Sequence, residues 1–495
     1  MILRVLSLFA NCRCLTGSAL VASVSLAVVP LCNADDDGLD AGPIYDRFAL
    51  TLAPGSRTEM LGPLFYSEEQ DTQHTWALPP LMSHTFEPIT DSEEFDFAYP
   101  VLTYDRYGKE YRWQLCQVLS FAGGQNQEEQ RAKRFTLFPI YFQQRSPVPE
   151  ENYTALFPLY GHMSHRLFRD DIFFVVFPIY GRTRKRDVVT HNYVYPIFHL
   201  RYGNNLEGWQ FWPIVGHEKK GVTTVTNGFG DTEVIGGHER RFVLWPLFFD
   251  ERTGLGTDNP AHQQVTPGIY GFLRSPRRDS TTVIWPFFSH VTDREKKYGE
   301  WQLPWPFVIF TRGEGKTVNR VFPFYSHAES AHMESAFYLW PLYKYNRYHA
   351  GALDRSRKRI LFFLYSDTVQ KNVETGQAQR RIDFLPFFTH KRDYNGSTRL
   401  QIFSVLEPFL PNSKSIERDY SQLWSVWRSE KNTKTAASSQ SLLWNLYRND
   451  QTSESKKCSL LFGLLQYQSN PGGKRLRVFY IPVVKTRSTA VTVSK

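Results

Sequence analysis

The stretch "VIWPFFSHVTDREKKYGEWQLPWPFVIFTRGEGKTVNRVFPFYSH", residues 283–327, contains three copies of one short phrase. The copies are Trp285-Pro286-Phe287-Phe288, Trp305-Pro306-Phe307-Val308 and Phe322-Pro323-Phe324-Tyr325. The segments between them are polar and rich in turn-forming residues, as in Arg312-Gly313-Glu314-Gly315-Lys316. A phrase that recurs at such a spacing has to be interpreted as a tandem repeat before any other feature is considered.

The phrase recurs along most of the chain, with an aromatic or aliphatic residue before the proline and an apolar pair after it. From Pro139 to Pro213 its prolines are 17 to 20 residues apart. Beyond residue 400 the proline is lost, but apolar pairs such as Leu443-Trp444 keep the rhythm. The structural repeat positions are Pro139, Pro158, Pro178, Pro196, Pro213, Pro246, Pro286, Pro306, Pro323, Pro341 and Pro386.

Proline is compatible with extended backbone and pushes the residue before it toward the β region. We therefore expect each phrase to form the middle of one strand and each polar segment to form a hairpin turn. The sequence then predicts an all-β protein, an antiparallel up-and-down meander of roughly twenty strands. Because proline lacks an N–H, its recurrence inside strands predicts a row of bulges that curves the sheet until it is closed or strongly curled into a barrel. A parallel β-solenoid is the rival architecture.

The N-terminus has the features of an export signal. Arg4 and Arg13 precede or flank a long apolar stretch, residues 15–31, and the first acidic residue is Asp35. We expect a signal peptide over residues 1–34, a mature N-terminal segment over 35–60, a continuous β-repeat domain over 61–484 and a polar tail over 485–495. An anchor that is not cleaved is the alternative. The predicted location is outside the cytoplasm, in the outer membrane or, alternatively, in the periplasm or at the cell surface.

Composition narrows the class of partner. The chain has 495 residues and a net charge of +9, and 15% of its residues are aromatic. In an exported protein, basic segments such as residues 182–186 favour contact with outer-membrane lipid or envelope polysaccharide rather than nucleic acid. Only Cys116 and Cys458 follow the export signal, so the fold is not a disulfide scaffold, and the sequence leaves open whether the two pair.

Six histidines stand four residues after a proline: His84, His162, His217, His290, His327 and His390. With one strand per repeat, this position alternates between the two ends of the sheet, so we expect them to be scattered rim residues and not metal ligands. The chain contains no HExxH, GxSxG or CxxC motif, which predicts a protein that is not an enzyme and has no cofactor. A Trp-Gln-apolar motif also recurs, as Trp113-Gln114-Leu115, Trp209-Gln210-Phe211 and Trp301-Gln302-Leu303. It indicates aromatic platforms for sugars or, by the more ordinary interpretation, core packing.

The repeat resembles that of uncharacterised exported bacterial proteins with tandem Phe/Trp-Pro-Leu/Ile-Phe/Tyr strand repeats, over about residues 60–400. The resemblance implies one continuous repeat fold and brings no activity with it. Two functions remain as hypotheses. The first is an outer-membrane barrel with a passage, anchoring or structural role. The second is a soluble exported β-sheet module that binds or scaffolds a polysaccharide or a protein.

Overall fold

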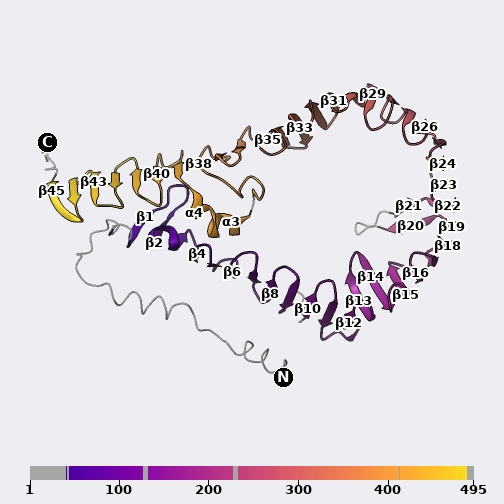
Figure 1. Cartoon of the computed structure of the whole chain (residues 1–495), viewed down its shortest axis with the longest axis horizontal. Helices are drawn as coiled ribbons and strands as arrows, with labels where there is room; N and C mark the ends of the chain where they lie inside the picture. The colour runs from indigo at the N-terminus through magenta and orange to yellow at the C-terminus, as the bar shows by residue number, and fades with distance from the viewer. Residues whose placement is uncertain (1–40, 42–43, 126–131, 227–231, 412, 488–495) are drawn as a thin grey trace. The chain divides into compact units, whose positions relative to one another are not determined.

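The computed structural model describes residues 41, 44–125, 132–226, 232–411 and 413–487, all within one compact unit, Asp40–Lys495. The expected signal peptide lies outside the described residues. Figure 1 shows the strands following one another along the sheet in chain order. The prediction of an all-β antiparallel meander is confirmed, since 43 strands form one sheet.

The strands are short, from four to eight residues. The first part of the sheet holds β1 (Asp46–Ala49), β2 (Gly55–Met60), β3 (Phe65–Gln70), β4 (Gln73–Leu78), β5 (Met82–Glu87), β6 (Ser92–Phe97), β7 (Leu102–Tyr107), β8 (Glu110–Leu115), β9 (Leu119–Gly123), β10 (Lys133–Leu137), β11 (Tyr141–Arg145), β12 (Tyr153–Leu156), β13 (Tyr160–Arg166), β14 (Arg169–Val175) and β15 (Tyr180–Lys185). The second holds β16 (Val188–Tyr193), β17 (Phe198–Gly203), β18 (Leu206–Phe211), β19 (Val215–Lys220), β22 (Gly237–Val243), β23 (Phe248–Leu255), β24 (Ala261–Thr266), β25 (Tyr270–Arg274), β26 (Arg278–Val283), β27 (Phe288–Asp293), β28 (Tyr298–Gln302), β29 (Val308–Gly313) and β30 (Lys316–Val321). The last holds β31 (Tyr325–Ser330), β32 (Met333–Tyr338), β33 (Tyr343–Ala350), β34 (Leu353–Ile360), β35 (Tyr365–Asn372), β36 (Ala378–Phe384), β37 (Phe388–Arg392), β38 (Thr398–Ile402), β39 (Trp427–Lys431), β40 (Ser438–Leu442), β41 (Tyr447–Gln451), β42 (Lys456–Leu460), β43 (Leu465–Asn470), β44 (Gly473–Val478) and β45 (Ile481–Arg487).

Each strand of this sheet pairs antiparallel with the strands before and after it. A separate hairpin, β20 (Thr223–Thr226) with β21 (Thr232–Ile235), is inserted between β19 and β22, which pair directly with each other. In the described sheet, β1 pairs with β2 and β45 with β44, and no β1–β45 pairing joins the two ends. The expected barrel closure is therefore not found in the described strands, and the expected count of about twenty strands is wrong.

The count differs because the proline phrase forms a turn, not the middle of a strand. In the repeat around Pro178, β14 ends at Val175, residues 176–179 form the turn, and β15 begins at Tyr180. The N–H of Ile179 donates to the carbonyl of Val176 at 2.8 Å and closes this turn. The peptide bond before each of the repeat prolines is cis, as in a type VI turn with proline at its third position. Each repeat thus contains two strands, joined at one end by a proline turn and at the other by a polar hairpin turn.

The proline turns also hydrogen-bond to one another along the sheet. The N–H of Phe177 donates to the carbonyl of Pro158 and that of Tyr195 to the carbonyl of Pro178, both at 2.7 Å. A proline in such a turn costs no ladder hydrogen bond, because it lies outside the strands whose N–H groups form the ladder. The bulges expected from proline inside strands are therefore unnecessary. We call the row of proline turns the Pro-turn edge and the opposite row of polar turns the hairpin edge.

One face of the sheet carries small side chains next to the Pro-turn edge, and we call it the small-residue face. Its members include Gly161, Gly181, Gly216, Gly271, Ser289, Ser326, Ser366 and Thr389. Aromatic rings cover these positions: a Cβ at Gly271 would lie 3.0 Å from Trp285 Cδ1, and one at Gly216 only 2.1 Å from Phe242 Cε1. A larger residue at Gly216 or Gly271 would therefore crowd a ring, whereas a Cβ at Gly181 would lie no closer than 3.8 Å to another atom.

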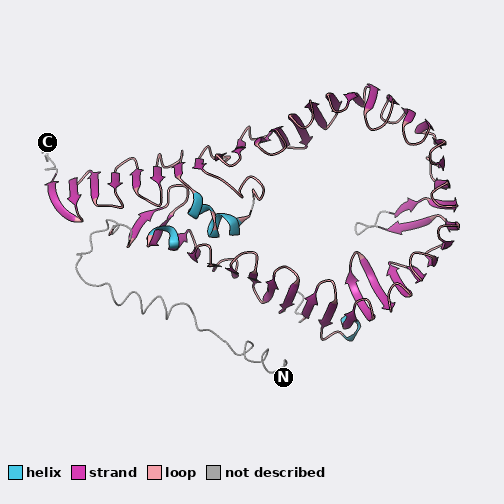
Figure 2. Cartoon of the chain, in the orientation of Figure 1, coloured by secondary structure: helices cyan, strands magenta, loops and turns pink. Residues whose placement is uncertain are grey.

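The apolar core is correspondingly thin. One cluster of buried hydrophobic residues, around Tyr153, Ala155, Met163 and Phe174, stands out among the described residues. Much of the other buried surface belongs to Ser, Thr, Asp and Arg side chains. Figure 2 shows that the longest interruption of the sheet is a helical insertion between β38 and β39, formed by α3 (Lys414–Asp419) and α4 (Ser421–Trp424). Short 3-10 turns also occur at η1 (Gly62–Leu64) and η2 (Pro149–Glu151).

Candidate functional site

The Pro-turn edge is an exposed apolar band. The residue after every one of the eleven repeat prolines is an isoleucine, leucine or phenylalanine with 40% to 61% of its surface exposed. The rings before the prolines lie next to one another, with centroids 5.5 Å apart for Phe157 and Phe177 and 5.6 Å apart for Phe322 and Trp340. Monomeric soluble proteins rarely expose a continuous apolar patch of this extent, which makes the band a candidate contact surface.

A second apolar row flanks the band on the face opposite the small-residue face, which we call the aromatic face. Residues that pair directly across neighbouring strands are apolar one after another, as in Tyr180 with Tyr193 and Tyr325 with Tyr338. The row continues through Val283 with Phe288. Because side chains alternate between faces, the pattern holds over many strands only if the register never slips.

The six candidate histidines lie in one row of this aromatic face. Each stands two residues beyond the apolar row, as His162 does beyond Tyr160 and His327 beyond Tyr325. His191 joins the same row from β16. The expectation that they are scattered between two ends was wrong, because two strands per repeat place every proline turn at one edge.

The histidines do not gather at one point, since several strands separate each from the next. Their neighbours are individual: His84 Nε2 lies 2.8 Å from Glu93 Oε1, and the ring centroid of His290 lies 4.2 Å from that of Trp301. Within the described part of the chain, no group of three His, Cys, Asp or Glu side chains is placed to hold a metal ion. Cys116 and Cys458 are both free thiols, which answers the question of their pairing.

The three repeated tryptophans belong to the same row as the histidines. Trp113, Trp209 and Trp301 have 38%, 43% and 52% of their surfaces exposed. The interpretation as core packing is therefore wrong for them. A row of Trp, Tyr, Phe and His between an apolar edge and charged residues has the composition of a surface that meets both hydrocarbon and water.

The helical insertion forms a polar link between distant parts of the chain, which we call the clasp (residues 413–424). Arg418 of α3 is 8% exposed, and its guanidinium donates to Thr85 Oγ1 at 2.8 Å, to Glu94 Oε2 at 3.1 Å and to Asp96. The Tyr66 hydroxyl donates to the carbonyl of Arg418 at 3.0 Å. The clasp thus joins β3, β5 and β6 to the C-terminal strands through ionic and polar contacts.

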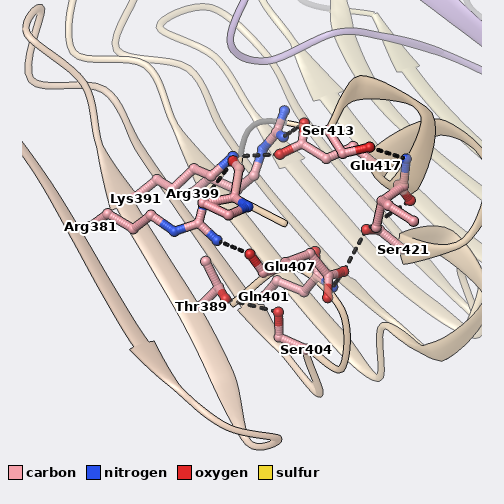
Figure 3. Close-up of polar contacts among 12 residues, drawn as sticks. Arg381, Thr389, Lys391, Arg399, Gln401, Ser404, Glu407, Ser413, Glu417 and Ser421 are labelled. Atoms are coloured by element: carbon pink, nitrogen blue, oxygen red, sulfur yellow. Dashed lines mark hydrogen bonds and ion pairs between the residues drawn. The ribbon is translucent and has the colours of Figure 1, made fainter. Parts of the chain in front are cut away.

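On its other side the clasp is held by polar side chains of β36–β38 and of the loop that follows β38 (Figure 3). Glu407 accepts from Gln401 Nε2 at 2.8 Å, Trp424 Nε1 at 3.0 Å and the Ser421 hydroxyl, and these donors help to hold its pKa below the usual range. Arg381 donates to the carbonyl of Glu407 at 2.6 Å. Lys391 and Arg399, which face each other across β37 and β38, both approach Glu417 of α3. The α3 carboxylate therefore relieves a like-charge pair of the sheet.

A cavity of about 410 Å³ lies beside the clasp. Every residue that lines it carries a charged, amide or hydroxyl group, among them Arg57, Glu68, Arg399 and Arg428. The cavity suits water or a hydroxylated ligand and excludes an apolar one.

Asp419 makes the clasp sensitive to pH. It is 1% exposed, and burial raises its pKa to about 6, against the opposing charge of Arg418. A carboxyl whose pKa is higher in the folded state stabilises that state when protonated, so the clasp loses stability as the pH rises from 3.8 to about 6. We expect Asp419→Asn to remove this slope and to stabilise the clasp above pH 6, by up to about 3 kcal/mol. The test is hydrogen exchange of the α3 amides, measured as protection factors between pH 3.8 and about 6. An Asp419→Asn variant that keeps the pH dependence of the wild type would contradict the role given to Asp419.

Comparison with known proteins adds no family. No protein-family model matches the sequence, and no curated protein matches it significantly.

Proposed function

We propose that the protein is a non-catalytic, exported component of the bacterial cell envelope that attaches to a lipid surface through its Pro-turn edge. One observation carries the proposal: the exposed apolar residues at the tips of successive proline turns all lie at the same edge of one sheet. Fully burying one such side chain contributes roughly 1.5–3 kcal/mol, so a row of them provides strong attachment. The export features of residues 1–34 and the resemblance of the repeat to exported bacterial proteins favour the outer membrane as that surface.

The dimensions of the band favour anchoring over passage. The proline turn and the first three residues of each strand extend for about 10–15 Å at ~3.3 Å per strand residue. The hydrocarbon core of a bilayer is ~30 Å thick, and a strand that crosses it needs about nine to eleven residues. The strands here have at most eight residues. A band of this depth fits one leaflet, with Trp, Tyr and His side chains at the level of the headgroups.

No helix among the described residues is long and apolar enough to cross a membrane.

Vesicle flotation tests the proposal. We expect the purified protein to float with phosphatidylcholine vesicles, to remain bound in high salt and to be released by detergent, because the contact is apolar. In cells, we expect it in the membrane fraction, not in the osmotic-shock fluid. A protein that stays at the bottom of the gradient and leaves the cell with the shock fluid would overturn the proposal.

A soluble module that binds an envelope polysaccharide is the second candidate, and the polar cavity beside the clasp favours it. That function predicts saturable binding of a soluble saccharide without any flotation. The same two measurements therefore separate the candidates.

A further inference from the structure

Four basic side chains gather on the small-residue face of strands β30–β35, and we call them the basic cluster. They are Arg320 of β30, Lys344 of β33, and Arg357 and Arg359 of β34. All four are half-buried. Lys344 and Arg359 are direct cross-strand partners, an arrangement that is unfavourable for like charges.

No carboxylate of these six fully described strands shares that face. Asp354 and Asp367 lie at positions of the opposite parity, and so do Glu329 and Glu334. Within the described part of the chain, the polar contacts of the cluster are with hydroxyl groups: Arg320 Nε donates to Ser326 Oγ at 3.4 Å and Arg357 Nε to Ser366 Oγ at 3.2 Å. Strands β30–β35 therefore supply no counter-ion to the cluster. The nearest carboxylate on this face, Asp383 of the next strand, acts on Arg357 but is itself paired with Arg381.

Two basic residues elsewhere on the same face are neutralised by carboxylates. Lys316 Nζ lies 2.8 Å from Glu300 Oε2, and Arg381 Nε lies 2.9 Å from Asp383 Oδ2. In the cluster, by contrast, Arg359 Nε is buried and has no hydrogen-bond partner among the described residues. Burial lowers the pKa of Lys344, and the charges of Arg359 and Arg320 lower it further. A group of cations that is half-buried and uncompensated is stabilised by an anion.

The cluster lies directly inside the Pro-turn edge. Arg320 and Arg359 each precede the last residue of their strand, and Lys344 is the second residue of its strand. Each therefore lies about 7 Å, two strand residues, from the adjacent proline turn or its equivalent. At a lipid surface the long Lys and Arg side chains reach from this depth to the headgroup phosphates.

We propose that the basic cluster binds a phosphate group, supplied by an anionic phospholipid headgroup when the Pro-turn edge is in a membrane. Guanidinium groups recognise phosphate through paired, charge-assisted hydrogen bonds, and a lysine adds a further point charge. Basic pockets of membrane proteins bind anionic headgroups in the same way. The choice of a lipid as the source rests on the proposed function, whereas phosphate recognition rests on the cluster alone.

The test compares the wild type, Arg320→Gln/Arg359→Gln and a matched control, Arg347→Gln/Arg355→Gln. The control removes the same charge from β33 and β34, nearer to the hairpin edge. Flotation is measured with vesicles of phosphatidylcholine, alone or with a minor fraction of phosphatidic acid. We expect phosphatidic acid to strengthen vesicle binding by the wild type and by the control. We expect this increase in affinity to be smaller by roughly tenfold or more in the cluster variant, which should still bind phosphatidylcholine vesicles. In a second measurement without membranes, calorimetry determines whether the same three proteins bind soluble glycerol phosphate.

The two arms separate the two proposals. If no vesicle is bound but glycerol phosphate binds saturably and the cluster variant loses that binding, the phosphate site holds and the membrane attachment fails. If the wild type and the cluster variant respond equally to phosphatidic acid and neither binds glycerol phosphate, the phosphate site is overturned. The variant relieves like-charge repulsion, so it is expected to fold.

Discussion

Three aspartates at neighbouring proline turns lower the partition of the protein into lipid vesicles by about 10⁴-fold. The change is Ile179→Asp, Ile197→Asp and Ile214→Asp, at side chains that are 57%, 40% and 47% exposed. Each isoleucine contributes about 2 kcal/mol when it enters hydrocarbon, and 1.4 kcal/mol is a tenfold change in an equilibrium constant. The aspartates also carry a charge that the acyl region disfavours. The measurement is a vesicle titration with phosphatidylcholine, because net charge of the lipid then has no part in it.

A matched control places the same three charges at the hairpin edge. Phe168, Met333 and Val373 are 95%, 53% and 49% exposed, and they lie in or next to hairpin turns. Phe168→Asp, Met333→Asp and Val373→Asp together remove as much exposed apolar surface and add as much charge. We expect this variant to bind vesicles like the wild type. Equal losses in both variants would mean that general hydrophobicity or net charge, not the Pro-turn edge, governs attachment.

The sequence predicted the class of fold but misplaced the proline phrase. The twenty-residue rhythm and the polar turns correctly indicated an antiparallel meander. The error was to place Trp285-Pro286-Phe287-Phe288 in one strand, although Val283 ends β26 and Phe288 begins β27. Apolar runs of this length fit either a short strand or an apolar turn, and turns are usually polar. The apolar turn was therefore the unrecognised signal, and it doubled the number of strands.

A clearer signal follows the phrase. Gly161, Gly181, Gly216 and Gly271 occupy corresponding positions directly after the first strand residue, and Ser289, Ser326 and Ser366 do so in later repeats. Five of these seven residues stand three positions after the proline of an aromatic-Pro pair, which marks a close approach or bend of the chain rather than the middle of a regular strand. This pattern was available in the sequence and was missed.

The clasp, in contrast, had no usable sequence signal. Arg418 meets Asp96 across more than three hundred residues of chain, and neither residue belongs to a motif. The basic cluster could be identified only once the strand register was known. Alternation along β34 places Arg357 and Arg359 on one face of the sheet and Asp354 on the other. Long-range pairing and the assignment of faces depend on the strand count, so both were lost when that count was wrong.

Arg418→Met opens the clasp. The substitution leaves Asp96 and Asp419, which are 5% and 1% exposed, without their cationic partner. Removing one member of a buried ion pair typically costs 3–5 kcal/mol, because the remaining charge is uncompensated. We expect the protection of the α3 amides from hydrogen exchange to fall by roughly 10²- to 10³-fold, while amides of β24–β27 keep theirs. Local exchange is the right measurement, since a sheet of nearest-neighbour contacts does not unfold as one unit.

Arg240→Met is the control for this prediction. Its Nε lies 2.6 Å from Glu251 Oε1, but the two side chains are 53% and 34% exposed, so solvent screens the pair. Exposed ion pairs contribute about 0–1 kcal/mol, and we expect little change in exchange anywhere. If Arg418→Met also left α3 protected, the ionic contacts would not be what holds the clasp, and Tyr66 and Tyr420, whose hydroxyls donate to the carbonyls of Arg418 and Tyr99, would be the residues to test next.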